Sequence, residues 1–174
     1  MTSLSSTTMD TPVGVLTLVA SDNGLRAVLW PDDRPDRVRL DAIDGTSASA
    51  QRVLDASTVQ LREYFAGERT EFDLLLDAVG TDFQQQAWQV LTTIPYGHTI
   101  TYGEQARRLG DANKSRAAGA ANGRNPISIV VPCHRVVGST GSLTGFAGGI
   151  EAKDWLLQHE RAHSPSAGQQ TLRT

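Results

Sequence analysis

The apolar segment Ile127–Val137 constrains this chain more strongly than any other part of its sequence. Four of the five residues at 127–131 are Ile or Val, and a proline stands on either side of them, which predicts a short buried strand. The only cysteine of the chain, Cys133, comes after this run, and His134 and Arg135 follow directly. A free cysteine is commonly an inert buried side chain, but a thiol, an imidazole and a guanidinium in succession are costly in an apolar segment that has no chemical task. We therefore expect the function to depend on Cys133.

Length and cysteine content limit the class of protein. A chain of 174 residues can form one domain with a substantial core, or two small domains in contact. A single cysteine excludes an internal disulfide, and no apolar run has the length of a membrane span or follows a basic segment as a signal peptide would. We expect a soluble, cytoplasmic protein that has no membrane partner.

The charge is divided unevenly along the chain. The formal net charge is −3, but residues 1–80 carry thirteen acidic residues and seven Arg, whereas residues 81–162 carry six acidic residues and eight Lys or Arg. The second half is therefore slightly basic, so the acidic total does not exclude a nucleic-acid partner.

The first half of the chain has the pattern of a small α+β scaffold. Residues 13–20 and 25–30 are two apolar runs joined across an Asn-Gly turn, which predicts an antiparallel hairpin. Residues 1–9 are rich in Ser and Thr and are expected to be loose. Apolar residues at helical spacing predict a helix over 48–66, and residues 72–76 are a candidate further strand. No motif in this half indicates chemistry.

The second half begins with three predicted helices. The first extends from Thr81, a plausible N-cap, to Ile94, and the others span residues 102–109 and 114–122. Two short helices across a tight turn that contains glycine match a helix-turn-helix. The last of them consists mostly of small residues, with Lys114 and Arg116 near its start, so it offers a smooth surface that can approach DNA phosphates.

The remaining pattern completes the predicted domain organisation. Glycines at 138–149 suit a wall around a flat ligand, although a flexible connector is an alternative, and a helix is predicted over 151–162. We expect an N-terminal scaffold domain at residues 1–80, a DNA-binding domain at 81–162 and a disordered tail at 163–174.

Several of these segments together resemble the O6-alkylguanine-DNA alkyltransferases, repair proteins that move an alkyl group from guanine O6 onto their own cysteine. The resemblance covers residues 81–162 in register and the first half more loosely. It implies an α+β fold, with an N-terminal ribonuclease-H-like α/β domain and a mostly helical C-terminal domain that has a winged-helix-like helix-turn-helix. The segments that carry it are Tyr102–Arg116, Asn122–Ile127, Pro132–Val137, Gly145–Gly149 and Leu156–Glu160.

The resemblance also implies an activity. An alkyl group would pass once from O6 of guanine, and also from O4 of thymine, in double-stranded DNA to Cys133 after the damaged base has been flipped out of the duplex. No cofactor is implied. Animal relatives bind a structural zinc partly through N-terminal cysteines, and a chain with one cysteine cannot form that site, so no metal is expected. The implied protein is a monomer in solution, and cooperative binding to DNA is left open.

Roles at the reacting centre come from the matching positions. Cys133 would be the nucleophile, His134 a base that acts through a water, and Glu160 the carboxylate that orients the histidine. Asn125 would brace the turn before the cysteine. A thiol with a pKa of about 8.5 is mostly protonated at neutral pH, so a base is chemically reasonable.

DNA and substrate contacts are implied in the same way. Tyr102 would press on the target phosphate, and Arg116 would enter the stack in place of the flipped base. Two of the binding positions depart from many relatives, because a Phe stands where they have Tyr or Trp and an Ala where some have Ser. Further DNA contacts would come from Lys114 and Ser139, and the base would be held by Val136, Leu143, Phe146, Ala147 and Gly148.

Two other classes of protein fit parts of the same pattern. Cys, His and Glu also suit a thiol hydrolase that transfers acyl groups. A non-catalytic DNA-binding protein built on the helix-turn-helix is the second alternative. Turnover on a small ester without DNA would favour the hydrolase, and full function of Cys133→Ala would favour the non-catalytic protein.

Overall fold

The computed structural model of the protein describes residues 3–45 and 47–165. None of the helices in these ranges is long and apolar enough to cross a membrane. The prediction of a disordered tail is wrong for its first two residues, because His163 is the last residue of a helix and Ser164 is buried. The prediction for residues 166–174 falls outside the described residues.

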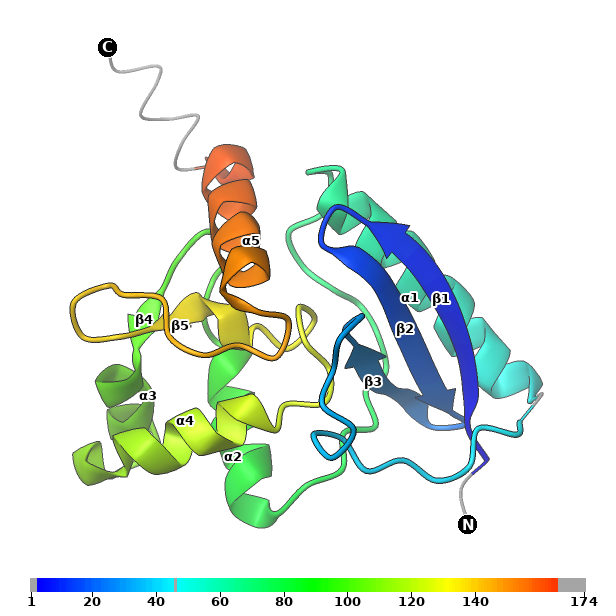
Figure 1. Cartoon of the computed structure of the whole chain (residues 1–174), viewed down its shortest axis with the longest axis horizontal. Coiled ribbons are helices and arrows are strands. Elements are labelled where there is room, and N and C mark those ends of the chain that lie inside the picture. The colour runs from blue at the N-terminus through cyan, green and yellow to red at the C-terminus, as the bar shows by residue number, and fades with distance from the viewer. Residues whose placement is uncertain (1–2, 46, 166–174) are drawn as a thin grey trace.

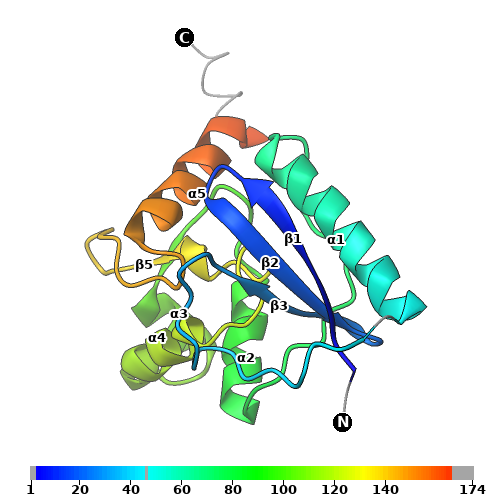
Figure 2. The same cartoon turned by 45° about the vertical axis from the view of Figure 1, so that its right-hand side comes forward.

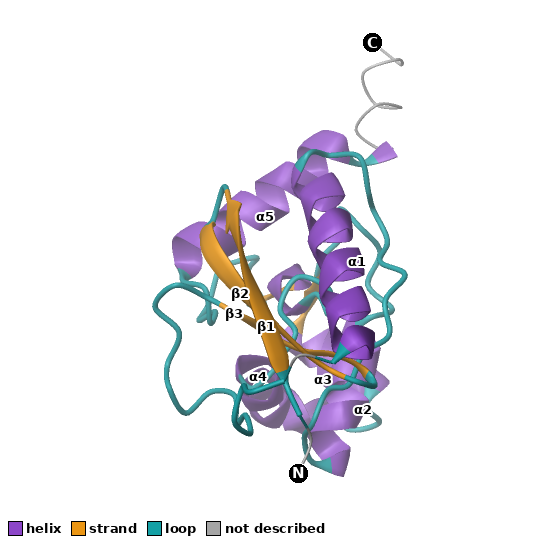
Figure 3. Cartoon of the chain, turned by 90° about the vertical axis from the view of Figure 1, so that its right-hand side faces the viewer, coloured by secondary structure: helices purple, strands orange, loops and turns teal. Residues whose placement is uncertain are grey.

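The first half is a three-stranded antiparallel sheet with one long helix along its face (Figure 1). The strands are β1 (Ser5–Thr11), β2 (Gly14–Ser21) and β3 (Gly24–Leu29), paired in chain order, and the helix is α1 (Ala48–Phe65). Figure 3 shows α1 and the sheet as two layers. The predicted hairpin and helix are confirmed. The expectation that residues 1–9 are loose is wrong for residues 5–9, whose alternation of buried and exposed side chains is that of an edge strand.

The strand proposed at residues 72–76 is also wrong. Of residues 72–76, only Leu76 forms a β-bridge, to Leu25 of β3, and two backbone hydrogen bonds of 2.8 Å flank that bridge. Phe72 and Leu74 pack against the core as parts of a loop. These two side chains are half-buried, and partial burial of apolar side chains does not require the backbone to form a strand.

The second half is mostly helical. The first helix begins as predicted, because Thr81 and Gln84 form a capping box, but it ends at Leu91 and not at Ile94. After Leu91 the chain continues with hydrogen bonds between residues three apart, such as Ile94 N–H to the Leu91 carbonyl. The proline that follows disfavours a helical conformation at Ile94. The elements are α2 (Asp82–Leu91), β4 (Ile100–Thr101), α3 (Tyr102–Arg108), α4 (Ser115–Gly123), β5 (Val136–Val137) and α5 (Ile150–His163).

Helices α3 and α4 form the predicted helix-turn-helix, with Lys114 in a single 3₁₀ turn before α4 and not in the helix itself. Gln105 and Asn122 hold the two helices together, because each side-chain amide donates to the other's oxygen at 2.8 Å and both residues are buried. The indole N–H of Trp88 donates to the Ala121 carbonyl at 2.8 Å and fixes α4 on α2. The orientation of α4 is therefore set by buried polar contacts.

The two halves share one hydrophobic core. The backbone of β3 bonds to the segment before Cys133, with Val28 N–H donating to the Pro126 carbonyl at 2.8 Å. The indole of Trp30 donates to the Ser128 hydroxyl at 3.1 Å. Figure 2 shows the C-terminal end of α1 beside α5. Helix α5 adds Ala152 and Leu156 to the same core. The N-terminal sheet thus supports the segment that leads to the cysteine.

The amide pair of the helix-turn-helix generates a stability prediction. Gln105→Ala leaves the Asn122 amide buried without its partner, so we expect the free energy of unfolding to fall by about 1–3 kcal/mol. Asn122→Ala should lower the free energy of unfolding by a similar amount. The double variant should lose clearly less than the sum of the two single losses, because the first substitution has already broken the hydrogen bonds between the two amides. Urea denaturation of the four proteins measures this. Strictly additive losses would show that the two amides do not act as a pair.

Candidate active site

The segment before Cys133 is a tight turn, so the prediction of a strand over residues 127–131 is wrong. The backbone doubles back, with Val131 N–H donating to the Ile127 carbonyl at 3.0 Å. Ile129 has a φ of +74°, which is strained for a β-branched residue. The composition of residues 127–131 indicated a strand because buried strands and this buried turn are both rich in Ile and Val. Within the described chain the segment pairs with the sheet only through the Ile127–Val28 bridge.

Asn125 clamps the two ends of this turn. Its side-chain oxygen accepts from Ile127 N–H at 3.1 Å, and its side-chain nitrogen donates to the Val131 carbonyl at 2.8 Å. The residue is buried, and an amide is suited to the place because it supplies both an acceptor and donors. The carbonyl of Asn125 in turn accepts from the guanidinium of Arg37, on the loop after β3. These contacts fix the turn from which Cys133 emerges.

Cys133 begins a single 3₁₀ turn, residues 133–135, and is only 6% exposed. Burial raises the pKa of the thiol, against the opposing influence of the Asn125 side chain and of the positive charges of Lys153 and Arg37. The thiol is therefore protonated at neutral pH, and a nucleophilic role requires a base.

His134 is fully buried, and its Nε2 lies 2.6 Å from Oε2 of Glu160 on α5. Burial lowers the pKa of His134 and outweighs Glu160, which acts to raise it. A carboxylate can only accept, so Nε2 carries the proton and donates it, and Nδ1 keeps its lone pair. Nδ1 is buried and makes no hydrogen bond with any described residue, which leaves it able to take a proton. Both residues stand in the 3₁₀ turn of residues 133–135 and not in an extended strand.

The Glu160 carboxylate accepts hydrogen bonds from four residues. Besides His134, the hydroxyl of Tyr64 donates at 2.6 Å, the guanidinium of Arg135 at 2.8 and 3.1 Å, and the backbone N–H of Gly97 at 3.2 Å. Burial pushes the pKa of Glu160 up, but His134 and Arg135 outweigh it and hold that pKa well below its ordinary value. With His134 neutral, Arg135 is the cation that balances the carboxylate. The place of Arg135 in an apolar segment indicated that it has a functional role. No local sequence pattern indicated such a role for Tyr64.

Lys153 is a second functional candidate that the sequence did not indicate. It is 1% exposed, and its ammonium donates to the Val136 carbonyl at 2.7 Å and to the Thr144 carbonyl at 3.4 Å. Burial lowers the pKa of Lys153, and the neighbouring Cys133 acts to raise it. The lysine thus ties the glycine-rich loop to the segment after the cysteine and places a positive charge near the thiol.

The predicted binding loop borders a cavity of about 720 Å³. Three of the predicted contacts, Phe146, Ala147 and Gly148, line it, whereas Val136 and Leu143 do not. Phe146 packs edge-on against Trp30 with ring centroids 5.3 Å apart, which holds the loop on the N-terminal half. Among the residues the structure describes, no three Cys, His, Asp or Glu side chains group as metal ligands would.

The helix-turn-helix presents the predicted DNA contacts on its surface. Lys114 and Arg116 are exposed and form no ion pair within the described part of the chain, whereas Arg107 and Arg108 pair with Glu104. The exposed face of α4 otherwise consists of small side chains.

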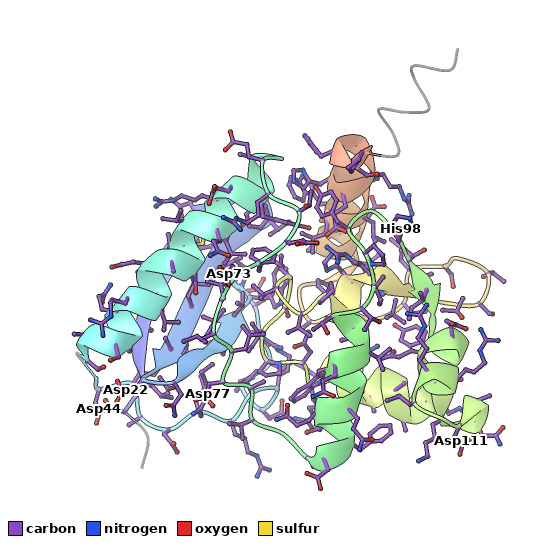
Figure 4. All side chains as sticks on the ribbon, turned by 180° about the vertical axis from the view of Figure 1, so that it is seen from behind. Asp22, Asp44, Asp73, Asp77, His98 and Asp111 are labelled. Atoms are coloured by element: carbon purple, nitrogen blue, oxygen red, sulfur yellow. The ribbon has the colours of Figure 1, made fainter. Side chains whose placement is uncertain are left out.

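Two further predicted DNA contacts lie on neighbouring elements. The hydroxyl of Tyr102, at the start of α3, is 2.7 Å from the Thr144 hydroxyl, and Ser139 is exposed on the glycine-rich loop. Figure 4 shows Asp22, Asp44, Asp73 and Asp77 on the N-terminal half, away from α3 and α4. Asp111 lies beside α3 and α4, but residues 1–80 hold thirteen of the nineteen acidic residues, so the acidic excess belongs to the N-terminal half.

Comparison with family profiles divides the chain into two matches. Residues 82–162 match the profile described as 6-O-methylguanine DNA methyltransferase, DNA binding domain, and residues 4–78 match its ribonuclease-like domain. The two profiles together span nearly the whole chain.

Individual relatives are similar over most of their length. A methylated-DNA–protein-cysteine methyltransferase of Mycolicibacterium paratuberculosis is 47% identical over 160 residues, which are 92% of this chain and 94% of the relative. The protein of that name from Shigella flexneri is 45% identical over 156 residues, 86% of this chain and 91% of the relative. The crystal structure of Mycobacterium tuberculosis OGT in complex with DNA superposes with a TM-score of 0.79 at 44% identity and covers 92% of this chain and 94% of that one.

A neutral buried His134 predicts a pH dependence of stability. Below pH 6.5 the unfolded chain takes up a proton on this histidine, but the folded protein does not until the pH reaches the lowered pKa. The unfolded state then binds more protons, so the free energy of unfolding should fall as the pH is lowered below about 6.5.

Urea denaturation at several pH values tests this. His134→Gln should flatten the dependence in that window, whereas His98→Gln, at an exposed site, should leave the slope as it is in the original protein. An unchanged slope in His134→Gln would contradict a neutral histidine.

Proposed function

This chain belongs to the 6-O-methylguanine DNA methyltransferase family, and on that basis we propose that it repairs alkylated DNA by accepting the alkyl group on Cys133. The substrate is double-stranded DNA that contains O6-alkylguanine, with O4-alkylthymine as a second lesion. The observation that carries the assignment to this cysteine is the neutral, buried His134 beside it, with its Nε2 on Glu160 and its Nδ1 able to accept a proton.

The chemical step is a displacement at the alkyl carbon. The sulfur of Cys133 forms a bond to that carbon as the bond to O6 breaks, and the thiol proton passes to Nδ1 of His134 through a water. The electron pair of the broken bond stays with the base, which becomes ordinary guanine on taking up a proton. Glu160 stabilises the imidazolium formed in this step, because its carboxylate already accepts from Nε2.

The reaction stops after one event per molecule. A thioether has no carbonyl for water to attack, and sulfur is a poor leaving group from an alkyl carbon, so the second half-reaction of an acyl-transferring thiol enzyme has no counterpart. The protein is therefore consumed as it repairs. Family membership disfavours both the thiol hydrolase and a purely non-catalytic binding protein.

Base flipping brings the lesion to the buried thiol. O6 of a paired guanine lies inside the duplex, so the nucleotide must leave the stack before the sulfur can reach it. The small side chains of α4 allow close approach, and Arg116 fills the space that the base leaves. Tyr102 presses on the target phosphate, and Lys114 and Ser139 contact the backbone nearby. The flipped base is held by Val136, Leu143, Phe146, Ala147 and Gly148.

The remaining parts of the proposal concern organisation. Residues 1–80 act as a scaffold and residues 81–162 as the alkyltransferase domain, and Asn125 braces the turn between α4 and the cysteine. The protein works without a cofactor, as a monomer in the cytoplasm. Cooperative binding along DNA is compatible with this arrangement.

Cys133→Ala tests the nucleophile. We expect transfer from a labelled O6-methylguanine duplex to be abolished, because no other thiol is present, while DNA binding survives, since the helix-turn-helix does not include the cysteine. Transfer is measured as label on the protein and binding as a gel shift. Transfer to the Ala variant would remove Cys133 from the mechanism, and loss of both properties would have to be separated from misfolding with Cys133→Ser.

Arg116→Ala tests the filling of the stack. Extrusion of a base costs on the order of a few kcal/mol, and each 1.4 kcal/mol is about tenfold in rate. The variant should therefore repair duplex DNA at least about tenfold more slowly while it reacts normally with free O6-benzylguanine. Arg161→Ala, which removes an exposed arginine of α5, is the matched control and should change neither rate. Equal losses on both substrates would assign Arg116 to the thiol chemistry or the fold.

A further inference from the structure

The Glu160 oxygen that orients His134 is shared with a residue of the N-terminal half. Oε2 accepts from Nε2 of His134 and from the hydroxyl of Tyr64, each at 2.6 Å. Tyr64 lies in the last turn of α1, whereas the other two side chains that donate to Glu160, those of His134 and Arg135, come from the second half of the chain. We propose that Tyr64 is a positioning residue that sets the basicity of His134 through Glu160. Its chemical consequence rests on the function proposed above.

The surroundings of Tyr64 hold its hydroxyl in one direction. The side chain is fully buried, and its ring contacts the rings of Phe65, Phe72, Tyr96 and His159 at centroid distances of 5.3 to 6.1 Å. Its backbone carbonyl accepts from Nε2 of His159 at 2.7 Å. The end of α1 is therefore attached to α5 through both the main chain and the side chain of one residue.

Competition for Oε2 gives the hydroxyl its effect. A donor on a carboxylate oxygen stabilises the negative charge and so weakens the pull of that charge on a neighbouring imidazole. Glu160 is 1% exposed, so water is poorly placed to replace a lost donor, and the remaining partner is bound more strongly. Tyr64 therefore helps to keep His134 neutral, which is the form that can take the thiol proton.

The other charged and titratable groups around the pair remain in place when this hydroxyl is removed. Arg135 and Lys153 both act to lower the pKa of His134, and Cys133 adjoins it in the chain. Tyr96, whose ring lies under the Arg135 guanidinium at 5.6 Å, carries a buried hydroxyl that bonds to no described residue. Tyr96→Phe thus removes a hydroxyl from the same cluster without breaking a hydrogen bond to Glu160. It is the matched control for Tyr64→Phe.

The test is a pH titration of the His134 imidazole by NMR in the DNA-free protein. We expect the midpoint to rise by about one pH unit in Tyr64→Phe, because one charge-assisted hydrogen bond is worth about that much, and to stay unchanged in Tyr96→Phe. An unmoved midpoint in Tyr64→Phe would overturn the proposal. If that variant does not fold, 3-fluorotyrosine in the intact chain makes the hydroxyl a stronger donor and must lower the midpoint instead.

This titration requires no alkyl transfer, so it separates the proposal from the proposed function. The rate of reaction with free O6-benzylguanine supplies the chemical readout. Its acid limb should move to higher pH in Tyr64→Phe by the same amount as the NMR midpoint. A residue with a purely structural role would lower the stability of the protein and leave both midpoints where they are.

Discussion

The buried carboxylate of Glu160 is the interaction on which the rest of this structure depends. Taking an ion out of water costs several kcal/mol, and this cost is offset only if the charge is paired and its oxygens are satisfied. Here the donors come from the end of α1, from the loop after α2 and from the 3₁₀ turn at the cysteine: Tyr64, Gly97, His134 and Arg135. The carboxylate is therefore stable only when both halves of the chain are folded against each other.

Burial also explains why the thiol is unreactive in the resting protein. Burial raises the pKa of Cys133 and lowers that of His134, so both groups are neutral and no ion pair forms in advance. A thiol that can be used once benefits from such protection, because a reactive thiolate would be lost to other electrophiles. Asn125 and Lys153 hold the loops on either side of the pair, so the site is rigid on the protein side.

Much of the fold and part of the site follow from local sequence patterns. The hairpin, α1, α5 and the start of α2 were predictable because apolar spacing and caps act over one element. The strand β1 was missed because its Ser and Thr residues form a half-exposed edge that has little apolar signal. The turn at 127–131 was mistaken for a strand because burial, which composition reports, does not determine backbone direction. Tyr64 and Lys153 could not be found, since their roles arise from contacts between distant elements.

The central claim, that Cys133 takes the alkyl group and keeps it, is tested most directly by intact-mass measurement followed by peptide mapping. The protein is exposed to an excess of duplex that contains O6-methylguanine. The account predicts that each protein molecule gains the mass of one methyl group in place of a hydrogen, that the gain maps to Cys133, and that repaired guanine reaches one equivalent and no more. Repaired guanine in clear excess over protein, or an unchanged protein mass, would contradict it.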